Sequence, residues 1–473
     1  MINRHEALLK IARAGVIGAG GGGFPAYGKF LACTKIDTVI ANGLECEPLL
    51  WCDKVLMRRM PSAIINGLEL SMKLAGASEG VVALKRDYAE IAKGLQAVID
   101  EREESGYYHL KFRVRLYLSD NFYPAGDELI LVHEVTGKVV AEGALPLSVG
   151  VLVHNVLSLQ QMENAIADVP VVSRLVSVVG EVEENKVFLA PLGVSLQELL
   201  RLVRLKRPLE ELRVIEGGPM MGRLLSKSEV ESFAVGKRTS GILLLPQQHP
   251  VVRSKEMSVQ EVIKRSKAVC CQCYRCSDLC PRSLLGHAIF PHQTMRSVDY
   301  GLSEPTSAIT SAFLCSQCGI CDLYACDVME LSPRKIFSEY RKMLQQAGVK
   351  NPHKSESKKD LSRQEMLKLP MSALLRKTRL SEYVHKDALF ETIYPSSVES
   401  QVAINIGEHI GERAQVVVKV GDQVSVGEMI AISPGLASGV VEKLGSSYHA
   451  SMNGIVSEAT SERVVIIKGE AYV

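Results

Sequence analysis

Nine of the twelve cysteines in this 473-residue chain lie between positions 270 and 326, and eight of them form two evenly spaced runs. The first run is Cys270, Cys273, Cys276 and Cys280, and the second is Cys315, Cys318, Cys321 and Cys326. The chain opens with MINRHEALLK, which lacks the features of a secretory signal, so we expect a cytoplasmic protein. Because thiols stay reduced in that compartment, clustered cysteines indicate metal ligation rather than disulfides.

The first run, C-x-x-C-x-x-C-x-x-x-C followed by Pro281, has the bacterial-ferredoxin spacing for [4Fe–4S] clusters. In that arrangement three close thiolates bind one cubane, and the fourth cysteine reaches across to the neighbouring one. Crossed ligation assigns one cluster to Cys270, Cys273, Cys276 and Cys326, and the other to Cys315, Cys318, Cys321 and Cys280. The second run has one extra residue before Cys326 and no proline after it, which leaves open whether both clusters are intact.

Two other interpretations of the cysteines remain open at this point: a pair of zinc sites, or core thiols that bind nothing. Four-cysteine zinc sites usually separate two C-x-x-C pairs by a longer spacer, whereas three consecutive steps of three favour a cubane. Cys271 stands outside the regular spacing, and we expect it to be a packed thiol.

A glycine-rich segment near the amino terminus is the second candidate site. Its glycines are Gly18, Gly20, Gly21, Gly22 and Gly23. Bare backbone of this kind can approach a flat ring or a phosphate closely. The pattern G-x-G-x-x-G normally follows a strand in dinucleotide-binding folds, but the preceding residues here look helical. The ordinary Rossmann interpretation therefore fails, and either another kind of nucleotide site or a surface turn is left.

Alternating helix-period and strand-like segments predict an α/β domain around this loop. Short β-rich runs then surround one helical piece, and short Val- and Ile-rich strands broken by glycines end the chain. The predicted domains are 1–168 (α/β), 169–246 (a small α+β module), 255–342 (the cysteine domain), 343–396 (a polar, basic linker) and 397–473 (an all-β sandwich or barrel). The formal net charge of +2 and the lack of an 18-residue apolar run predict neither nucleic-acid binding nor a membrane span.

Five motifs, in order along the chain, resemble a known family. They are G-x-G-G-G-G-F-P-x-x-x-K at 18–29, N-G-L-E-C-E-P at 42–48, Y-P-A-G-D-E at 123–128, H-N-V at 154–156 and E-G-G-P-M-M-G at 216–222. With the cysteine runs, this set resembles the NADH-binding flavoprotein subunit of complex I. It is more similar to the C subunit of Rnf-type electron-transport complexes and to PduS-type cobalamin reductases. Gly22 and Ala26 depart from the alanine and threonine that are usual in these relatives.

The resemblance implies a multidomain α/β fold and a set of cofactor sites. Its parts would be a Rossmann-like, complex-I-type FMN and NADH domain, a β-grasp (SLBB) module, a two-cluster ferredoxin-like domain and a barrel-sandwich hybrid. FMN would be held by the glycine loop with Phe24, Lys29, Asn42, Tyr123 and Asn155, and the catalytic candidates Glu45, Glu47 and Glu128 would line the flavin and nicotinamide site. The alternatives are a surface ion pair for Lys29 and solvated carboxylates for the glutamates.

The carboxy-terminal segments V-G-D-Q-V-S-V-G and S-M-N-G-I-V resemble half-motifs of a lipoyl-type carrier, but no lysine stands at the expected hairpin tip. A structural or docking role is therefore expected. Tyr448 and His449 are either a pair that faces a corrinoid or simply exposed. In Rnf-type C subunits the comparable module comes first, whereas here it comes last, which favours the PduS-type branch.

The implied reaction passes electrons from NADH to FMN, to two [4Fe–4S] clusters and then to an acceptor. By the PduS resemblance the acceptor is a corrinoid, with cob(II)alamin reduced to the cob(I)alamin that an adenosyltransferase consumes, inside a bacterial microcompartment. The sequence beside the glycine loop has no pair of arginines that could bind the 2′-phosphate of NADPH, which favours NADH as the donor. The alternatives are a peripheral subunit of an Rnf-like membrane complex, or a non-catalytic relay or scaffold between other proteins.

Overall fold

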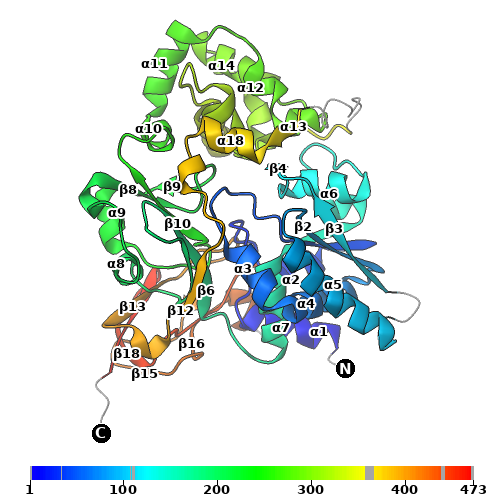
Figure 1. The fold of residues 1–473 in the computed structure, drawn as a ribbon, viewed down its shortest axis with the longest axis vertical. Helices are drawn as coiled ribbons and strands as arrows, with labels where there is room; N and C mark the ends of the chain where they lie inside the picture. The colour runs from blue at the N-terminus through cyan, green and yellow to red at the C-terminus, as the bar shows by residue number, and fades with distance from the viewer. Residues whose placement is uncertain are drawn as a thin grey trace.

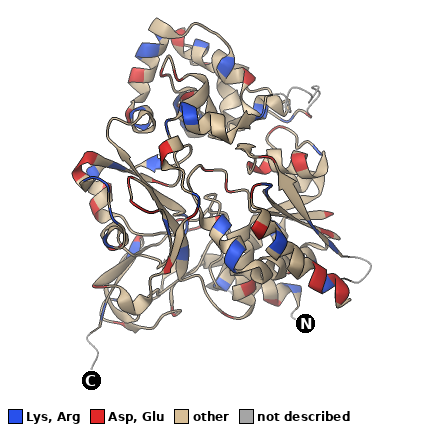
Figure 2. Cartoon of the chain, viewed as in Figure 1, with Lys and Arg blue, Asp and Glu red and all other residues tan. Residues whose placement is uncertain are grey.

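The structure is a computed structural model, and it describes residues 3–32, 35–106, 108, 112–356, 367–437 and 443–469. In Figure 1 the helical cysteine segment lies at the top, above the amino-terminal α/β unit on one side and a second sheet on the other. The carboxy-terminal strands lie beneath that second sheet. Acidic and basic residues are interspersed along the elements in this view (Figure 2).

The amino-terminal unit is a four-stranded parallel sheet in the order β3-β2-β1-β5, with the register placing Asn42 beside Asn155. Its strands are β1 (Thr38–Asn42), β2 (Glu79–Lys85), β3 (Arg113–Ser119) and β5 (Val151–Asn155). The helices are α1 (Arg4–Arg13), α2 (Ala26–Leu31), α3 (Cys52–Arg59), α4 (Pro61–Ala75), α5 (Ala89–Glu104), α6 (Glu128–Thr136) and α7 (Val156–Ile166). The strands β1, β2 and β5 are almost wholly buried, as expected for a parallel sheet covered on both faces. Helix α1 precedes the glycine loop, as the sequence predicts.

The second unit is a mixed sheet in the order β12-β7-β6-β10-β8-β9, in which the central strands β6 and β10 run parallel. Its elements are β6 (Ser173–Gly180), β7 (Lys186–Pro191), α8 (Leu196–Arg201), β8 (Leu212–Glu216), β9 (Arg223–Leu224), α9 (Lys227–Ser232) and β10 (Gly241–Pro246). Strand β12 (Leu389–Thr392) comes from the segment predicted as linker. It pairs in parallel with β7 and so completes the edge of this sheet.

The cysteine segment is built of short helices around its own apolar core, which includes Val262, Met295 and Phe337. Its helices are α10 (Pro250–Glu256), α11 (Val259–Val269), α12 (Arg275–Asp278), α13 (Pro281–Leu284), α14 (Pro291–Asp299), α15 (Ser307–Thr310) and α16 (Pro333–Gln346). Residues Cys321–Ala325 form a single π-helical turn. A π turn accommodates one more residue than an α turn, so it absorbs the extra residue before Cys326.

Two further elements of the predicted linker tie the cysteine segment to the first unit. Strand β11 (Leu369–Pro370) pairs with β4 (Phe122–Tyr123), and α18 (Met371–Lys377) follows it directly. The polar composition of 343–396 predicted a tether, but some of its apolar residues, such as Leu369 and Leu374, are buried in the contacts between units. The segment is therefore partly structured, and residues 357–366 lie outside the described part of the chain.

The carboxy-terminal unit is a sandwich of two small sheets, in the orders β13-β19-β18-β15 and β14-β16-β17. Its elements are β13 (Gln401–Asn405), β14 (Gln415–Val416), β15 (Gln423–Val424), β16 (Met429–Ile432), α19 (Pro434–Ala437), β17 (Tyr448–His449), β18 (Gly454–Ala459) and β19 (Arg463–Ile467). Its core is continuous with that of the β6–β10 sheet. Tyr448 and His449 are both buried inside it, so neither faces a corrinoid and neither is exposed.

Candidate functional site

Two cavities in the helical segment are lined by the two crossed sets of cysteines. One is lined by Cys280, Cys315, Cys318 and Cys321, and we call it the inner cavity. The other, the outer cavity, is lined by Cys270, Cys271, Cys273, Cys276 and Cys326. Each cavity thus gathers three thiols of one run and the last thiol of the other run. Cys271 also reaches the outer cavity and is exposed, so the prediction of a packed thiol at that position is wrong.

The two runs follow the same backbone path around their cavities. Gln272 and Gln317, at equivalent positions, both have positive φ angles, +54° and +63°. The side-chain amide of Gln272 donates to Cys270 Sγ at 3.2 Å, and that of Gln317 donates to Cys315 Sγ at 3.3 Å. Amide donors that point at thiolate sulfur are a recognised means of tuning iron–sulfur centres.

The chemistry of these thiols fits an iron–sulfur cluster better than a single metal ion. Among the described residues, no three Cys, His, Asp or Glu side chains converge closely enough to hold one ion. Tetrahedral zinc draws its four sulfurs to about 2.3 Å from one centre. A cubane instead places one thiolate at each iron corner, which suits thiols spread around a cavity wall. Burial raises the pKa of Cys276 to about 12 and that of Cys280 to about 11, so ionised sulfur here requires a cationic partner.

The inner cavity adjoins the amino-terminal unit. The hydroxyl of the buried Tyr123 donates to the carbonyl oxygen of Cys318 at 2.6 Å. Arg282, two residues after Cys280, donates to the carboxylate of Asp127 at 3.0 Å, and both side chains are almost buried. Tyr123 therefore lies between the amino-terminal unit and the inner cavity, and it contacts the loop that surrounds this cavity. The residues that line the outer cavity all belong to the helical segment.

The glycine loop presents bare backbone on its outer side. Gly18 N donates to Phe24 O at 2.8 Å, and Gly23 N donates to Gly18 O, so the loop is closed on itself. A Cβ built on Gly21 or Gly22 would meet nothing within 4 Å, and one on Gly20 would meet only the Cβ of Asn155 at 3.8 Å. A flat ring or a phosphate can therefore approach this backbone, which fits the flavin that the sequence predicts.

The two predicted asparagines end adjacent parallel strands, at the edge where ligands bind in such sheets. Asn42 Nδ2 donates to Gly126 O at 2.9 Å, inside the Y-P-A-G-D-E motif. Asn155 caps helix α7 through Leu157 N, and its Nδ2 donates to Asp53 Oδ2 at 2.8 Å. Three of the sequence motifs therefore converge on this edge of the sheet.

Glu45 and Asp53 form an interacting carboxyl pair beside Asn155. Glu45 Oε2 accepts the backbone N–H of Asp53 at 2.7 Å, and its backbone lies at a φ of +33°. Burial, with the nearby Asp53 carboxylate, raises the pKa of Glu45 to about 8. Burial also raises the pKa of Asp53, to about 6, although the hydrogen bond from Asn155 lowers it. The raised pKa values favour retention of a proton by this pair near neutral pH, and perturbed carboxyl groups of this kind are common at functional sites.

The other two glutamates make different contacts. Glu47 accepts Met220 N at 2.9 Å and Met221 N at 2.7 Å, so it binds the E-G-G-P-M-M-G loop at 216–222. Glu128 lies 3.7 Å from Lys29 Nζ in a partly exposed ion pair. Lys29 Nζ also donates to Val153 O at 2.6 Å, one residue before the H-N-V motif. Phe24 packs its ring against Gly28 and is partly exposed.

Some residues at these sites carried no signal in the sequence. Asp53 lies in the first turn of helix α3 and belongs to none of the motifs. Arg174 is buried and donates to Ala19 O in the glycine loop at 2.6 Å. Arg334 lines the inner cavity although it follows the last cysteine by eight positions. Arg174 and Arg334 act across units of the fold, and Asp53 contacts Asn155 across 102 positions of the chain, so no local pattern predicts these roles.

Comparison with known proteins assigns most of the chain. Residues 11–164 match the Nuo51 FMN-binding domain, residues 269–331 match a 4Fe-4S dicluster domain, and residues 384–471 match the RnfC barrel sandwich hybrid domain. Cobalamin reductase PduS of Citrobacter freundii is 34% identical over 97% of this chain and 96% of its own length. The chain belongs to the PduS-type cobalamin reductase family. This PduS-type chain thus contains an FMN-binding domain and a [4Fe–4S] domain.

Other known proteins are also similar to this PduS-type chain. Cobalamin reductase PduS of Salmonella typhimurium is 33% identical over 99% of this chain and 98% of its own length. The C subunit of the Na(+)-translocating ferredoxin:NAD(+) oxidoreductase complex of Acetobacterium woodii is 30% identical over 58% of each chain. The crystal structure of an NAD+-reducing [NiFe]-hydrogenase in its H2-reduced state shares the fold over 74% of this chain and 63% of its own, with a TM-score of 0.50 at 19% identity. Within the described ranges, none of the helices has the length and apolar character to cross a bilayer.

Proposed function

We propose that this chain is an NADH-dependent oxidoreductase that reduces a corrinoid, cob(II)alamin to cob(I)alamin, for an adenosyltransferase. The observation that carries the proposal is the hydrogen bond, 2.6 Å long, from the Tyr123 hydroxyl to the carbonyl oxygen of Cys318. This bond joins the flavin-type unit to the loop around a thiol-lined cavity. Two proteins named cobalamin reductase align with nearly the whole chain, which supports the choice of acceptor. By the same similarity, the proposal includes a location inside a bacterial microcompartment.

The proposed cofactors are one FMN and two [4Fe–4S] clusters, with NADH as the donor. The glycine loop, Asn42 and Asn155 would hold FMN, and the two thiol sets would each hold one cluster. When bound, a flavin accepts hydride as an electron pair, whereas iron–sulfur clusters carry single electrons. Lys29, Phe24 and Glu128, which lie along the same motif, are proposed to contact the phosphate and the nicotinamide.

The chain's own residues provide position and protons. Asn42 and Asn155 fix the sheet edge, and the uncovered loop backbone leaves space for a planar ring. Glu45 Oε2 accepts the backbone amides of Asp53 and Lys54, so a proton kept by the Glu45–Asp53 pair is proposed to lie on another of its carboxyl oxygens. That proton is available to a ligand bound beside Asn155. Glu47 holds the 216–222 loop against the first unit.

The proposed domains have the bounds predicted from the sequence, and the 343–396 segment connects the units through the pairing of β11 with β4 and of β12 with β7. We also propose that 169–246 is the β-grasp (SLBB) module. Its strands, numbered along the chain, stand in the order 2-1-5-3-4, with the first and fifth parallel, which supports this topology. The continuous core with the carboxy-terminal sandwich supports a structural role for both units.

The experiment is an anaerobic reduction followed by absorbance. The full chain, reconstituted with FMN, iron and sulfide, receives NADH, and then hydroxocobalamin with its adenosyltransferase. We expect NADH to bleach the flavin and cluster bands, and adenosylcobalamin to form in proportion to the NADH consumed. The Gly94→Ala variant, in helix α5 and outside the proposed sites, should behave as wild type, because its added Cβ meets nothing within 4 Å. A protein that binds neither FMN nor iron would contradict the proposal.

A second candidate function is that of a peripheral subunit that passes electrons to a membrane complex. The 30% identity with the C subunit of an ion-translocating complex, over 58% of this chain, favours it. Bleaching by NADH without corrinoid turnover, together with reduction of a partner protein, would select this function. A third, a non-catalytic relay, would be selected by clusters that assemble in a chain that binds no flavin.

A further inference from the structure

The wall of the inner cavity contains a buried cation that the proposed function does not use. Arg334, near the start of α16, lines this cavity together with Cys280, Cys315, Cys318 and Cys321. Its side chain is only 11% exposed. The residues that line the outer cavity, in the part of the chain that the structure describes, include no lysine or arginine. The two thiol sites therefore differ in local charge.

Arg334 is held from two sides. Its Nε donates to Asp322 Oδ2 at 3.0 Å, and its backbone N–H donates to Asp322 Oδ1 at 3.1 Å. Ser332 Oγ also donates to Asp322, whose side chain is fully buried. Because Asp322 directly follows Cys321, this ion pair is built into the loop that surrounds the inner cavity. A buried Arg–Asp pair with such geometry is rigid, and losing one partner leaves an uncompensated charge.

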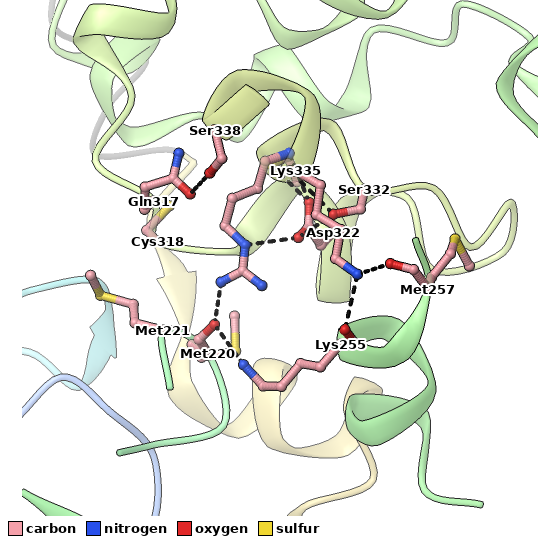
Figure 3. A network of polar contacts seen from close by, with 12 residues as sticks. Met220, Met221, Lys255, Met257, Gln317, Cys318, Asp322, Ser332, Lys335 and Ser338 are labelled. Carbon is pink, nitrogen blue, oxygen red and sulfur yellow. Dashed lines mark hydrogen bonds and ion pairs between the residues drawn. The ribbon is translucent and has the colours of Figure 1, made fainter. Parts of the chain in front are cut away.

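The second anchor is the E-G-G-P-M-M-G loop at 216–222. Arg334 Nη1 donates to Met220 O at 2.5 Å, and Lys255 Nζ donates to Gly222 O at 2.5 Å. Figure 3 shows Met220, Lys255, Asp322 and Cys318 in this one network. The opposite side of the loop binds Glu47 through Met220 N and Met221 N. The loop thus spans from the acidic motif of the first unit to the cation at the inner cavity.

Two glycines allow the 216–222 loop to lie close to Glu47 on one side and to the inner-cavity loop on the other. A Cβ on Gly319, which lies between Cys318 and Cys321 at a φ of +78°, would come within 3.1 Å of Met220 O and 3.2 Å of Arg334 Nη1. A Cβ on Gly218 would come within 2.1 Å of Glu47 Oε2. Both positions need glycine for the contact with the neighbouring unit, which gives the otherwise unexplained motif a physical role.

We propose that Arg334 is the positioning residue that raises the reduction potential of the inner-cavity cluster above that of the outer one, and that the 216–222 loop fixes it there by binding Glu47. One electron takes a four-thiolate [4Fe–4S] cluster from a net charge of −2 to −3, with no proton required. A fixed cation stabilises that added negative charge, so the reduced state is favoured. This inference rests on the proposed iron–sulfur occupancy of both cavities.

The test is a potentiometric titration with dithionite, followed by electron paramagnetic resonance, on the reconstituted full chain. Iron and sulfide are counted first, and the Cys318→Ser variant assigns which signal belongs to the inner cavity. We expect Arg334→Met to lower the midpoint potential of the inner cluster alone and Arg334→Lys to retain most of the wild-type value. Asp322→Asn should shift the same midpoint upward, and the double variant R334M/D322N should return it towards wild type.

The charge compensation in the double variant separates a charge effect from simple damage to the fold. Equal shifts in both clusters, no shift in Arg334→Met, or a double variant that shifts as far as Arg334→Met would each overturn the inference while leaving the proposed function intact. If Arg334→Met fails to assemble, Asp322→Asn decides the outcome: an upward shift of the inner midpoint alone supports the inference, and a downward shift or none overturns it. A wild-type chain without clusters would overturn both the inference and the proposed function.

Discussion

Substitution of Gly218 by alanine tests the link between the acidic motif and the 216–222 loop. The added Cβ would lie 2.1 Å from Glu47 Oε2, so the carboxylate must move by about 1 Å and release Met220 N and Met221 N. Hydrogen bonds to a charged acceptor contribute about 1.5–3 kcal/mol each, and part of that loss is recovered from water because Glu47 is partly exposed. We therefore expect the loop to lose about 3 kcal/mol of local stability.

Amide hydrogen exchange measures that loss directly. A change of about 3 kcal/mol corresponds to roughly 100-fold faster exchange of the Met220 and Met221 amides. Gly22→Ala is the matched control, because its Cβ meets nothing and exchange at 216–222 should not change. Unchanged protection in Gly218→Ala would refute the reasoning, since Glu47 would then not be the acceptor of these two amides.

Three further predictions concern the carboxyl pair, the thiols and the unit junctions. Since the raised pKa of Glu45 lets the folded chain keep a proton that the unfolded chain loses, the free energy of unfolding should fall as pH rises from about 5 to 8. Glu45→Gln should flatten that slope in urea titrations, and an unaltered slope would refute the assignment. Cys326→Ser should lose about half of the bound iron, whereas Cys271→Ser should keep all of it; equal iron contents would contradict the crossed sets. Lys237 Nζ donates to Gly15 O and Ser447 O, and a buried carbonyl left without its donor costs about 1–3 kcal/mol, so Lys237→Met should lower the stability of the chain in thermal unfolding. A wild-type melting temperature would argue against a stabilising role for these two contacts.

The thiol sets were accessible from the sequence because their ligands follow a fixed spacing. Crossed ligation requires only that the two runs pack against each other, and the cavities gather the sets that the spacing predicts. From the sequence alone, the extra residue before Cys326 left open whether both clusters are intact. In the fold it is taken up by the π turn Cys321–Ala325, which keeps Cys326 at the outer cavity.

The proposed flavin site at the edge of the parallel sheet was predictable for a different reason. Asn42 and Asn155 belong to motifs shared with the family, and parallel pairing of β1 with β5 places them side by side. Asp53 was missed because an acidic residue in the first turn of a helix carries no distinctive pattern. Its effect on Glu45 depends on burial and on a contact across eight residues, neither of which periodicity reveals.

Contacts between units were beyond sequence reasoning. Tyr123 and Cys318 are 195 positions apart, and Arg334 and Met220 are 114 apart. Such pairs are fixed by how finished units pack against one another. The strand β12 was missed for a related reason, since four residues of mixed polarity gain their structure only from the edge of β7.

We propose that electrons from NADH enter the amino-terminal unit and reach both thiol sites. The most direct measurement is anaerobic rapid-freeze electron paramagnetic resonance after one equivalent of NADH, with flavin absorbance followed in parallel. We expect flavin bleaching to be followed by reduced-cluster signals from two distinct [4Fe–4S] centres, and Cys318→Ser to remove one of them. Flavin that bleaches while both clusters stay oxidised would contradict it.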